Sequence, residues 1–173
     1  MWPGALWEKL YEPLIRKAAG LGRATYSTDP DRREKRWAHC DLLVVGAGPT
    51  GLAAALTAGR AGARVILADE AAAPGGADPA DGCEAILRDL AGLENVWILP
   101  RTTVFGWYDD NVFGAVERVQ PHGMAADPDR PVERLWRIVA REAILATGAE
   151  ERPLVFGGND IPGVMMAGAV RSY

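Results

Sequence analysis

Short apolar runs alternate with helix-like segments in the first half of the chain, and this pattern predicts parallel strands joined by helices. Three runs are continuously apolar, as expected of strands that are buried on both faces, at 42–45, 65–68 and 96–99. An Ala- and Leu-rich stretch follows the first run and favours a helix that ends near Gly62. A second helix is predicted at 83–93, where Ile86, Leu87 and Leu90 share one face.

The second half of the chain changes to hairpin-like segments. Residues 102–119 predict two antiparallel strands that are joined by a turn at 109–111, and 133–140 predicts a further strand of the same meander. The apolar run at 143–146 predicts a separate buried strand beside the first one. The expected fold is therefore α/β: a Rossmann-like dinucleotide-binding domain with a parallel sheet and an inserted antiparallel β-meander.

The first forty residues have a different pattern. Leu6, Leu10, Leu14 and Ala18 recur at helical spacing, but Pro13 interrupts them. Either two short helices meet there, or the main helix has Pro13 in its first turn. Residues 25–39 are polar and indicate a linker, so we expect a helical segment with linker at 1–40 and the dinucleotide-binding domain at 41–173. A helix begins near 165 with no signal that closes it, and we expect a longer polypeptide.

The turn after the first predicted strand carries the main functional signal, Gly46-Ala47-Gly48-Pro49-Thr50-Gly51. In a strand–turn–helix, this glycine spacing is typical of dinucleotide binding. Gly46 permits the tight turn, Gly48 leaves room for the pyrophosphate, and Gly51 allows close packing of the helix. The helix start, with its free amides and dipole, favours the phosphate charge.

Acidic residues at the end of the second predicted strand complete this signal. Asp69 is placed to accept the ribose hydroxyls and to repel the 2′-phosphate of NADP, whereas its neighbour Glu70 is either a second contact or a solvated side chain. Gly75 and Gly76 lie in a small-residue loop that is either beside the nucleotide or a plain connection. Thr147-Gly148, at the carboxyl end of the strand predicted at 143–146, is a further candidate contact because ligands bind at that edge.

Composition narrows the class of protein. The chain has 173 residues, 49% hydrophobic and 24% charged, and its net charge of −4 gives no case for nucleic acid. Cys40 and Cys83 are far apart, so they signal neither a metal site nor a local redox disulfide. No signal peptide or membrane-spanning run is evident, which favours a cytoplasmic protein.

No catalytic acid, base or nucleophile can be assigned. His39 and His122 are expected to be structural or solvated, and Trp107-Tyr108 to pack in the meander. The glycine turn carries Pro49-Thr50 rather than the serine of a nucleophile elbow. A chain without such groups is compatible with an oxidoreductase subunit, because in those enzymes the cofactor carries the redox step.

The order of glycine turn, acid, Gly-Gly loop, meander and Ala-Thr-Gly resembles that of the two-dinucleotide-binding-domain flavoproteins. Four stretches narrow the resemblance to the alpha subunits of heterotetrameric sarcosine oxidases, at 11–22, 101–109, 146–156 and 159–165. The similarity covers almost the whole chain.

This resemblance implies a component of an enzyme that demethylates sarcosine oxidatively to glycine, forming hydrogen peroxide and passing a one-carbon unit to tetrahydrofolate. It implies NAD in the alpha subunit, FAD in the beta subunit, with FMN between the two. It also assigns Gly46, Gly48 and Gly51 to the nucleotide turn, Asp69 to the ribose and Thr147-Gly148 to a second contact. The family's alpha subunit is far longer, with a region before this segment and a folate-binding region after it.

Two other interpretations stay open. The chain is alternatively the alpha-type subunit of a related FAD-dependent dehydrogenase of proline, opines or glycine, with FAD in this site. A third interpretation is a non-catalytic interaction fragment that keeps the fold without the nucleotide. The identity of a bound nucleotide distinguishes all three.

Overall fold

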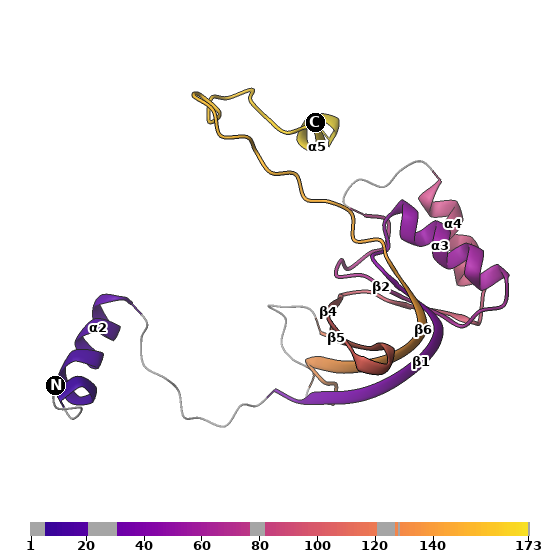
Figure 1. Cartoon of the computed structure of the whole chain (residues 1–173), viewed down its shortest axis with the longest axis horizontal. Helices are drawn as coiled ribbons and strands as arrows, with labels where there is room; N and C mark the ends of the chain where they lie inside the picture. Colours follow the sequence, from indigo (N-terminus) through magenta and orange to yellow (C-terminus); the bar gives the residue numbers. More distant parts are fainter. Residues whose placement is uncertain (1–5, 21–30, 77–81, 121–126, 128, 173) are drawn as a thin grey trace. The chain divides into compact units, whose positions relative to one another are not determined.

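The computed structural model describes residues 6–20, 31–76, 82–120, 127 and 129–172 (Figure 1). The chain divides into two compact units, residues 1–30 and 31–173. In the first, a π-helical turn (η1, Trp7–Tyr11) runs into helix α2 (Glu12–Ala18). Pro13 lies in the first turn of α2, where its missing N–H has no helical partner to lose. Both expectations for Pro13 are therefore met, since two short helices meet and the second has proline in its first turn.

The second unit is built on one six-stranded sheet with the order β3-β2-β1-β6-β5-β4. Strands β1 (Arg33–Val45), β2 (Val65–Ala68), β3 (Val96–Leu99) and β6 (Glu133–Leu145) run parallel. Strands β4 (Thr102–Tyr108) and β5 (Val112–Arg118) continue the sheet in antiparallel fashion beyond β6. The predicted α/β fold with an inserted meander is confirmed, including the tight connection at Asp109–Asn111.

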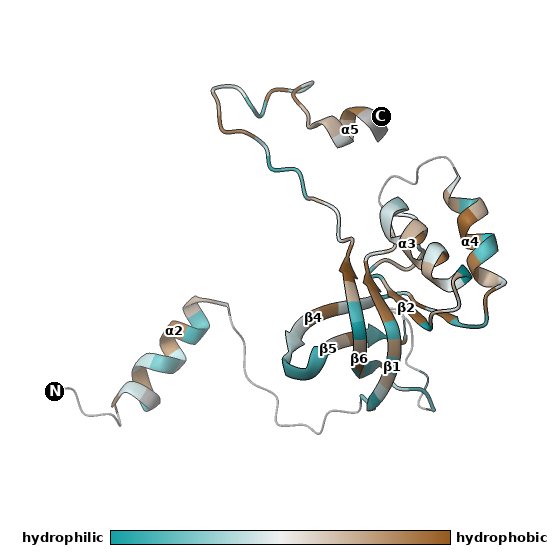
Figure 2. Cartoon of the chain, turned by 45° about the vertical axis from the view of Figure 1, so that its right-hand side comes forward, coloured by the Kyte–Doolittle hydropathy of each residue, from teal (hydrophilic) through white to brown (hydrophobic). Residues whose placement is uncertain are grey.

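Two expectations about the strands are wrong. The predicted linker is strand from Arg33 onward, because those polar residues pair with Glu133–Ala140 of β6 and need not be apolar where one sheet face is solvated. Accordingly, β1 changes from hydrophilic at its start to hydrophobic at its end (Figure 2). The strands predicted at 133–140 and 143–146 are the single strand β6, since no Gly or Pro breaks the backbone at Arg141-Glu142.

The end of β6 is also less buried than predicted. β5 pairs with β6 only as far as Val139, so residues 142–145 have β1 as their only paired neighbour among the described strands. Ile144 is 38% exposed and Leu145 is 72% exposed.

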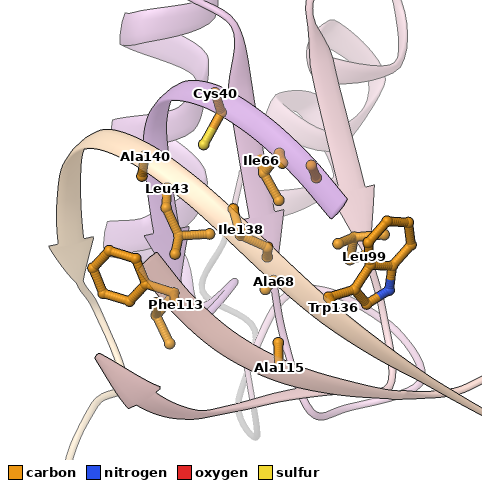
Figure 3. Packing of buried hydrophobic residues seen from close by; sticks show 12 residues of the cluster. Cys40, Leu43, Ile66, Ala68, Leu99, Phe113, Ala115, Trp136, Ile138 and Ala140 are labelled. Carbon is orange, nitrogen blue, oxygen red and sulfur yellow. The ribbon is translucent and has the colours of Figure 1, made fainter. Parts of the chain in front are cut away.

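Each face of the parallel strands carries its own core. Helices α3 (Pro49–Arg60) and α4 (Cys83–Ala91) lie side by side over one face and bury Leu52 and Leu90 against Val44 and Leu67. The meander curls over the other face and buries Phe113, Trp136 and Ile138 against Leu43 and Ile66 (Figure 3). The adjacent residues Leu43 and Val44 therefore face opposite cores, as the period of two in a strand requires.

The ends of the helices follow the sequence. Gly62, directly after the cap of α3, has a φ of 86°, the left-handed conformation that ends helices at glycine. A short helix α5 (Ala167–Ser172) begins near the predicted position.

Candidate functional site

The turn between β1 and α3 holds the predicted glycines at the carboxyl edge of the sheet. Gly46 follows the last residue of β1 with a φ of 99°, and its N–H donates to the carbonyl of Ala68 over 2.8 Å. Gly48 is the N-cap of α3, and Pro49 occupies the first turn. The sequence pattern thus forms the expected strand–turn–helix.

The three glycines are needed for different reasons. A Cβ at Gly46 would lie 2.3 Å from the carbonyl oxygen of Ala146, and one at Gly51 would lie 1.8 Å from the carbonyl oxygen of Gly46. These two glycines are therefore required by the fold itself. A Cβ at Gly48 would meet nothing within 4 Å, so no described part of the chain requires glycine at this position.

The start of α3 presents polar groups that suit an anion. The first amides of a helix have no partner within the helix, and this first turn contains neither a side-chain cap nor an acidic residue. Pro49 and Thr50 are exposed, so the helix start is open to a ligand. The partial positive charge of the helix dipole acts at the same place.

Asp69 connects the end of β2 to this turn. One carboxylate oxygen accepts a hydrogen bond from the amide of Ala47, and the other accepts one from the amide of Ala71 at 2.8 Å. Asp69 therefore fixes the glycine turn and the loop after β2, and each oxygen retains acceptor capacity for a hydroxyl. Glu70 is exposed, and none of its contacts in the described part of the chain reaches the turn.

The remaining predicted residues border the same turn. The Gly75 amide donates to the Ala47 carbonyl over 2.8 Å, and a Cβ at Gly76 would lie 3.4 Å from the Cα of Gly48. On the other side, the Ala146 amide donates to the Val45 carbonyl over 2.7 Å, which positions the exposed residues Thr147 and Gly148 directly after it. The structure thus assembles all the predicted glycines, Asp69 and Thr147 around one turn, and leaves Glu70 at its margin.

Two arginines near Asp69 were not predicted as site residues. The Arg101 amide donates to the Ala71 carbonyl over 2.8 Å, and the Arg118 guanidinium donates to the Glu70 carbonyl over 3.4 Å. The Arg118 amide also donates to the carbonyl of Arg101 over 2.9 Å. Arg101 follows β3 much as Asp69 follows β2, and that position was the available signal. The Arg118 guanidinium therefore places positive charge beside Glu70, and the Arg101 guanidinium donates to the Arg118 carbonyl over 3.2 Å.

A cavity of about 260 Å³ lies at the opposite edge of the sheet, lined among others by Trp37, His39, Arg64 and Trp97. The Cys40 thiol also lines it, but burial raises the pKa of this thiol to about 11, so it stays protonated near neutral pH. His39 is exposed, and His122 lies outside the described residues. The cavity, Cys40 and His39 lie at the amino edge of the sheet, away from the glycine turn.

The described residues offer neither a cluster of metal ligands nor a helix that could span a membrane. No cluster of three or more His, Cys, Asp or Glu side chains that could hold a metal ion occurs among them. None of their helices combines the length and the apolar character needed to span a membrane.

Comparison with known proteins relates the chain to flavin enzymes. The family model of FAD dependent oxidoreductases matches residues 41–99, which include the glycine turn and Asp69. The sarcosine oxidase alpha subunit of Rhizobium meliloti (strain 1021) is 66% identical over 184 aligned residues, covering 100% of this chain and 19% of the relative. The corresponding protein of Corynebacterium sp. (strain P-1) is 48% identical, covering 89% of this chain and 17% of the relative.

A subunit of a differently named oxidase is also similar. An opine oxidase subunit of Agrobacterium tumefaciens (strain Ach5) is 36% identical over 148 residues, covering 76% of this chain and 28% of the relative. The chain therefore spans between 17% and 28% of the length of these relatives. The chain is thus similar to subunits of named oxidases and, over 41–99, to the FAD dependent oxidoreductases.

Proposed function

Because the chain belongs, over the segment that it spans, to the family of sarcosine oxidase alpha subunits, we propose that it is the dinucleotide-binding part of such a subunit. The cofactor pyrophosphate lies over Gly46 to Gly51, at the start of α3. Asp69 accepts the ribose hydroxyls, and Gly75, Gly76, Thr147 and Gly148 border the ligand.

The open space at Gly48 is the observation that carries this proposal. Gly46 and Gly51 are explained by clashes with the backbone, but Gly48 is not. A glycine that the protein does not require, next to free helix amides, is explained by a ligand that approaches the backbone closely. An adenine dinucleotide fits this arrangement because its pyrophosphate carries the negative charge that the helix start favours.

NAD is the cofactor that we propose first, on the resemblance to the alpha subunits. The carboxylate of Asp69 suits a free ribose hydroxyl and disfavours a 2′-phosphate. FAD is the second candidate, because the matched family is that of FAD dependent oxidoreductases and includes the same turn. Either cofactor supplies the electron-accepting chemistry, while this chain binds it and orients it.

The activity that we propose belongs to a complete enzyme rather than to this chain alone. It is the oxidative demethylation of sarcosine to glycine, with formation of hydrogen peroxide and transfer of a one-carbon unit to tetrahydrofolate. The principal partner is a beta-type subunit that holds FAD, with FMN between it and the alpha subunit. The proposed location is the cytoplasm.

Releasing the nucleotide from purified protein and determining its mass tests the cofactor. NAD supports the first assignment, and FAD supports a subunit of the opine oxidase kind, the second candidate favoured by the relative from Agrobacterium tumefaciens. If neither is released and neither binds in calorimetry, the dinucleotide function is wrong and a non-catalytic interaction fragment remains.

An assay of peroxide formation from sarcosine, with FAD, FMN and NAD supplied, tests whether the chain works only within a complete enzyme. We expect no turnover by the isolated chain and turnover once a beta-type subunit is co-purified with it. Turnover by the chain alone would contradict the proposal.

A further inference from the structure

Three rows of directly opposed residues cross four strands on one face of the sheet. Opposed residues in paired strands project from the same face, and so do residues two positions apart along a strand. We refer to this set as the outer face, and its rows run in the order β1, β6, β5, β4: Lys35–Leu135–Val116–Thr103, Trp37–Arg137–Gly114–Gly106 and His39–Val139–Val112–Tyr108.

Within the second unit, the largest side chains of the outer face are exposed, and Trp37 and His39 line the cavity described above. The alternate residues of the same strands, such as Ala38, Ile138 and Phe113, are buried in the core on the opposite side. On the outer face only Gly114 is buried, whereas Trp37 is 58% exposed and Tyr108 is 56% exposed. The meander therefore has one face in a core and one bearing large exposed side chains.

The aromatic rings on this face are held in place. A Cβ at Gly114 would lie 2.7 Å from the ring of Phe105, which is itself 54% exposed, and a Cβ at Gly106 would lie 2.6 Å from the Tyr108 hydroxyl. The absence of a side chain at Gly114 and at Gly106 thus leaves room for the Phe105 and Tyr108 rings. The Arg137 guanidinium carbon lies 5.1 Å from the ring centroid of Trp37. Rings fixed in advance lose little conformational entropy when a partner binds.

The charge on the outer face has one sign. Its three rows contain the cations Lys35 and Arg137 and no acidic residue, and Glu133 of the adjoining row pairs with Arg33 at 3.2 Å. In the part of the chain that the structure describes, no carboxylate lies within ion-pair distance of Lys35 or Arg137. By contrast, Glu34 and Glu117 of the same sheet bind Arg134 on the core side, at 2.7 and 2.9 Å.

We propose that the outer face docks the acidic surface of a separate protein subunit. Tryptophan, tyrosine and arginine are the residues enriched in binding hot spots, and the unpaired cations fit carboxylates on the partner. A second copy of this chain is a poor occupant, because two cationic faces repel each other. A continuation of the same polypeptide is the other occupant to be tested, because the relatives extend well beyond the segment that this chain spans. This inference rests on the proposed function in so far as the partner is the beta-type subunit.

Hydroxyl-radical footprinting tests the surface. We compare the chain alone with the chain in the complex that it forms with the co-expressed beta-type subunit. Oxidation of Trp37, Phe105 and Tyr108 should fall about tenfold or more in the complex, as expected for residues desolvated at the centre of an interface. Phe156, which follows β6, is 52% exposed and lies outside the outer face, so it is the internal control and should not change.

A charge reversal gives an independent measurement. Arg137→Glu should raise the dissociation constant of the complex about tenfold or more and reduce its dependence on salt, since one buried charged contact is worth about 1.4 kcal/mol or more. Arg88→Glu, on the exposed side of α4, is the matched control and should leave both unchanged. Dinucleotide affinity should be unaltered in both variants, which separates this inference from the proposed function.

Several outcomes would overturn the inference. If the complex forms while Trp37, Phe105 and Tyr108 remain accessible to oxidation, the interface lies elsewhere. The same conclusion follows if Arg137→Glu and Arg88→Glu weaken the complex equally. If the three aromatic residues are protected from oxidation in the isolated chain and the chain has the mass of a dimer, the outer face binds a second copy. Protection in a longer alpha chain without the beta-type subunit would assign it to the same polypeptide. Protection by vesicles containing phosphatidylserine, but not by the subunit, would assign it to a membrane surface.

Discussion

The two edges of the parallel sheet differ in how far their polar groups are satisfied. At the amino edge, Arg64 forms three hydrogen bonds of 2.9–3.0 Å with the carboxylate of Asp41 through its amide and its guanidinium. The Asn95 side chain there donates to two carbonyls, those of Gly59 and Ala63. At the carboxyl edge, the helix start has free amides and Gly48 faces open space. Satisfied groups indicate a structural role, and open ones indicate a ligand.

This contrast matters because the cavity and the motif lie at different edges. The cavity of about 260 Å³ is at the satisfied edge, where Arg64 is already paired and Cys40 is protonated. The glycine turn lies at the other edge, where the first amides of α3 have no partner within the helix. Chemistry therefore favours the turn as the cofactor site, and the predictions below test this difference between the edges.

Gly51→Ala should have the largest effect on stability. Its methyl group would lie 1.8 Å from the carbonyl oxygen of Gly46, so the backbone of the turn must move. Overpacking of this kind costs about 3 kcal/mol, which urea unfolding measures. Gly157→Ala is the control, because a Cβ there meets nothing within 4 Å. Equal stability of the two variants would mean that the turn is not packed as described.

Gly48→Val should separate binding from folding. The open space around Gly48 accommodates the side chain, so stability should fall only by about 1 kcal/mol through the less favourable N-cap. Overpacking against a pyrophosphate costs about 1–3 kcal/mol, so the affinity measured by calorimetry should fall about tenfold to hundredfold. Gly157→Val is the control for both measurements. Unchanged affinity would exclude the turn as the binding site.

Asp69 should disfavour NADP relative to NAD. A carboxylate close to a 2′-phosphate in a partly buried site costs about 1–3 kcal/mol, and Asp69→Asn should reduce that preference. The same variant should weaken NAD binding, because an amide cannot replace both bonds to Ala47 and Ala71. Glu70→Gln is the matched control. If NADP binds the native protein as tightly as NAD does, then Asp69 is not the ribose contact, and Arg101 and Arg118 become candidates for holding the phosphate.

The sequence predicted well what depends on local pattern. Strands β2 and β3, the hairpin at Asp109–Asn111 and the end of α3 at Gly62 all follow from apolar runs and glycine positions. The glycine turn was predictable for the same reason, since the motif, the strand before it and the helix after it are contiguous. The roles of its residues in binding stay predictions.

What depends on distant pairing was not predictable. Most residues from Arg33 to His39 are polar, and their strand conformation depends on pairing with β6. The two polar residues Arg141-Glu142 indicate a break between two strands. Strand β6 nevertheless continues through them, because it pairs with β1 beyond the end of β5, and those two residues alone do not indicate this pairing. Arg118 lies near Asp69 because β3 and the meander converge there, which no local pattern indicates, whereas Arg101 could have been found from its position just after β3.

Acid should weaken the pairing of Asp41 with Arg64 at the amino edge of the sheet. Of the four predicted effects, we expect this one to be the smallest. The hydrogen bonds from Arg64 lower the pKa of Asp41 from 3.8 to about 2. The unfolded chain therefore takes up a proton at Asp41 before the folded chain does, so the stabilisation is present above the unfolded pKa and is lost as pH falls towards 2. The difference in unfolding free energy between the native chain and Asp41→Asn should be constant above about pH 5 and shrink below it. It should also shrink in high salt, because the pair is exposed to solvent. A difference that does not depend on pH would show that Arg64 does not bind the ionised carboxylate.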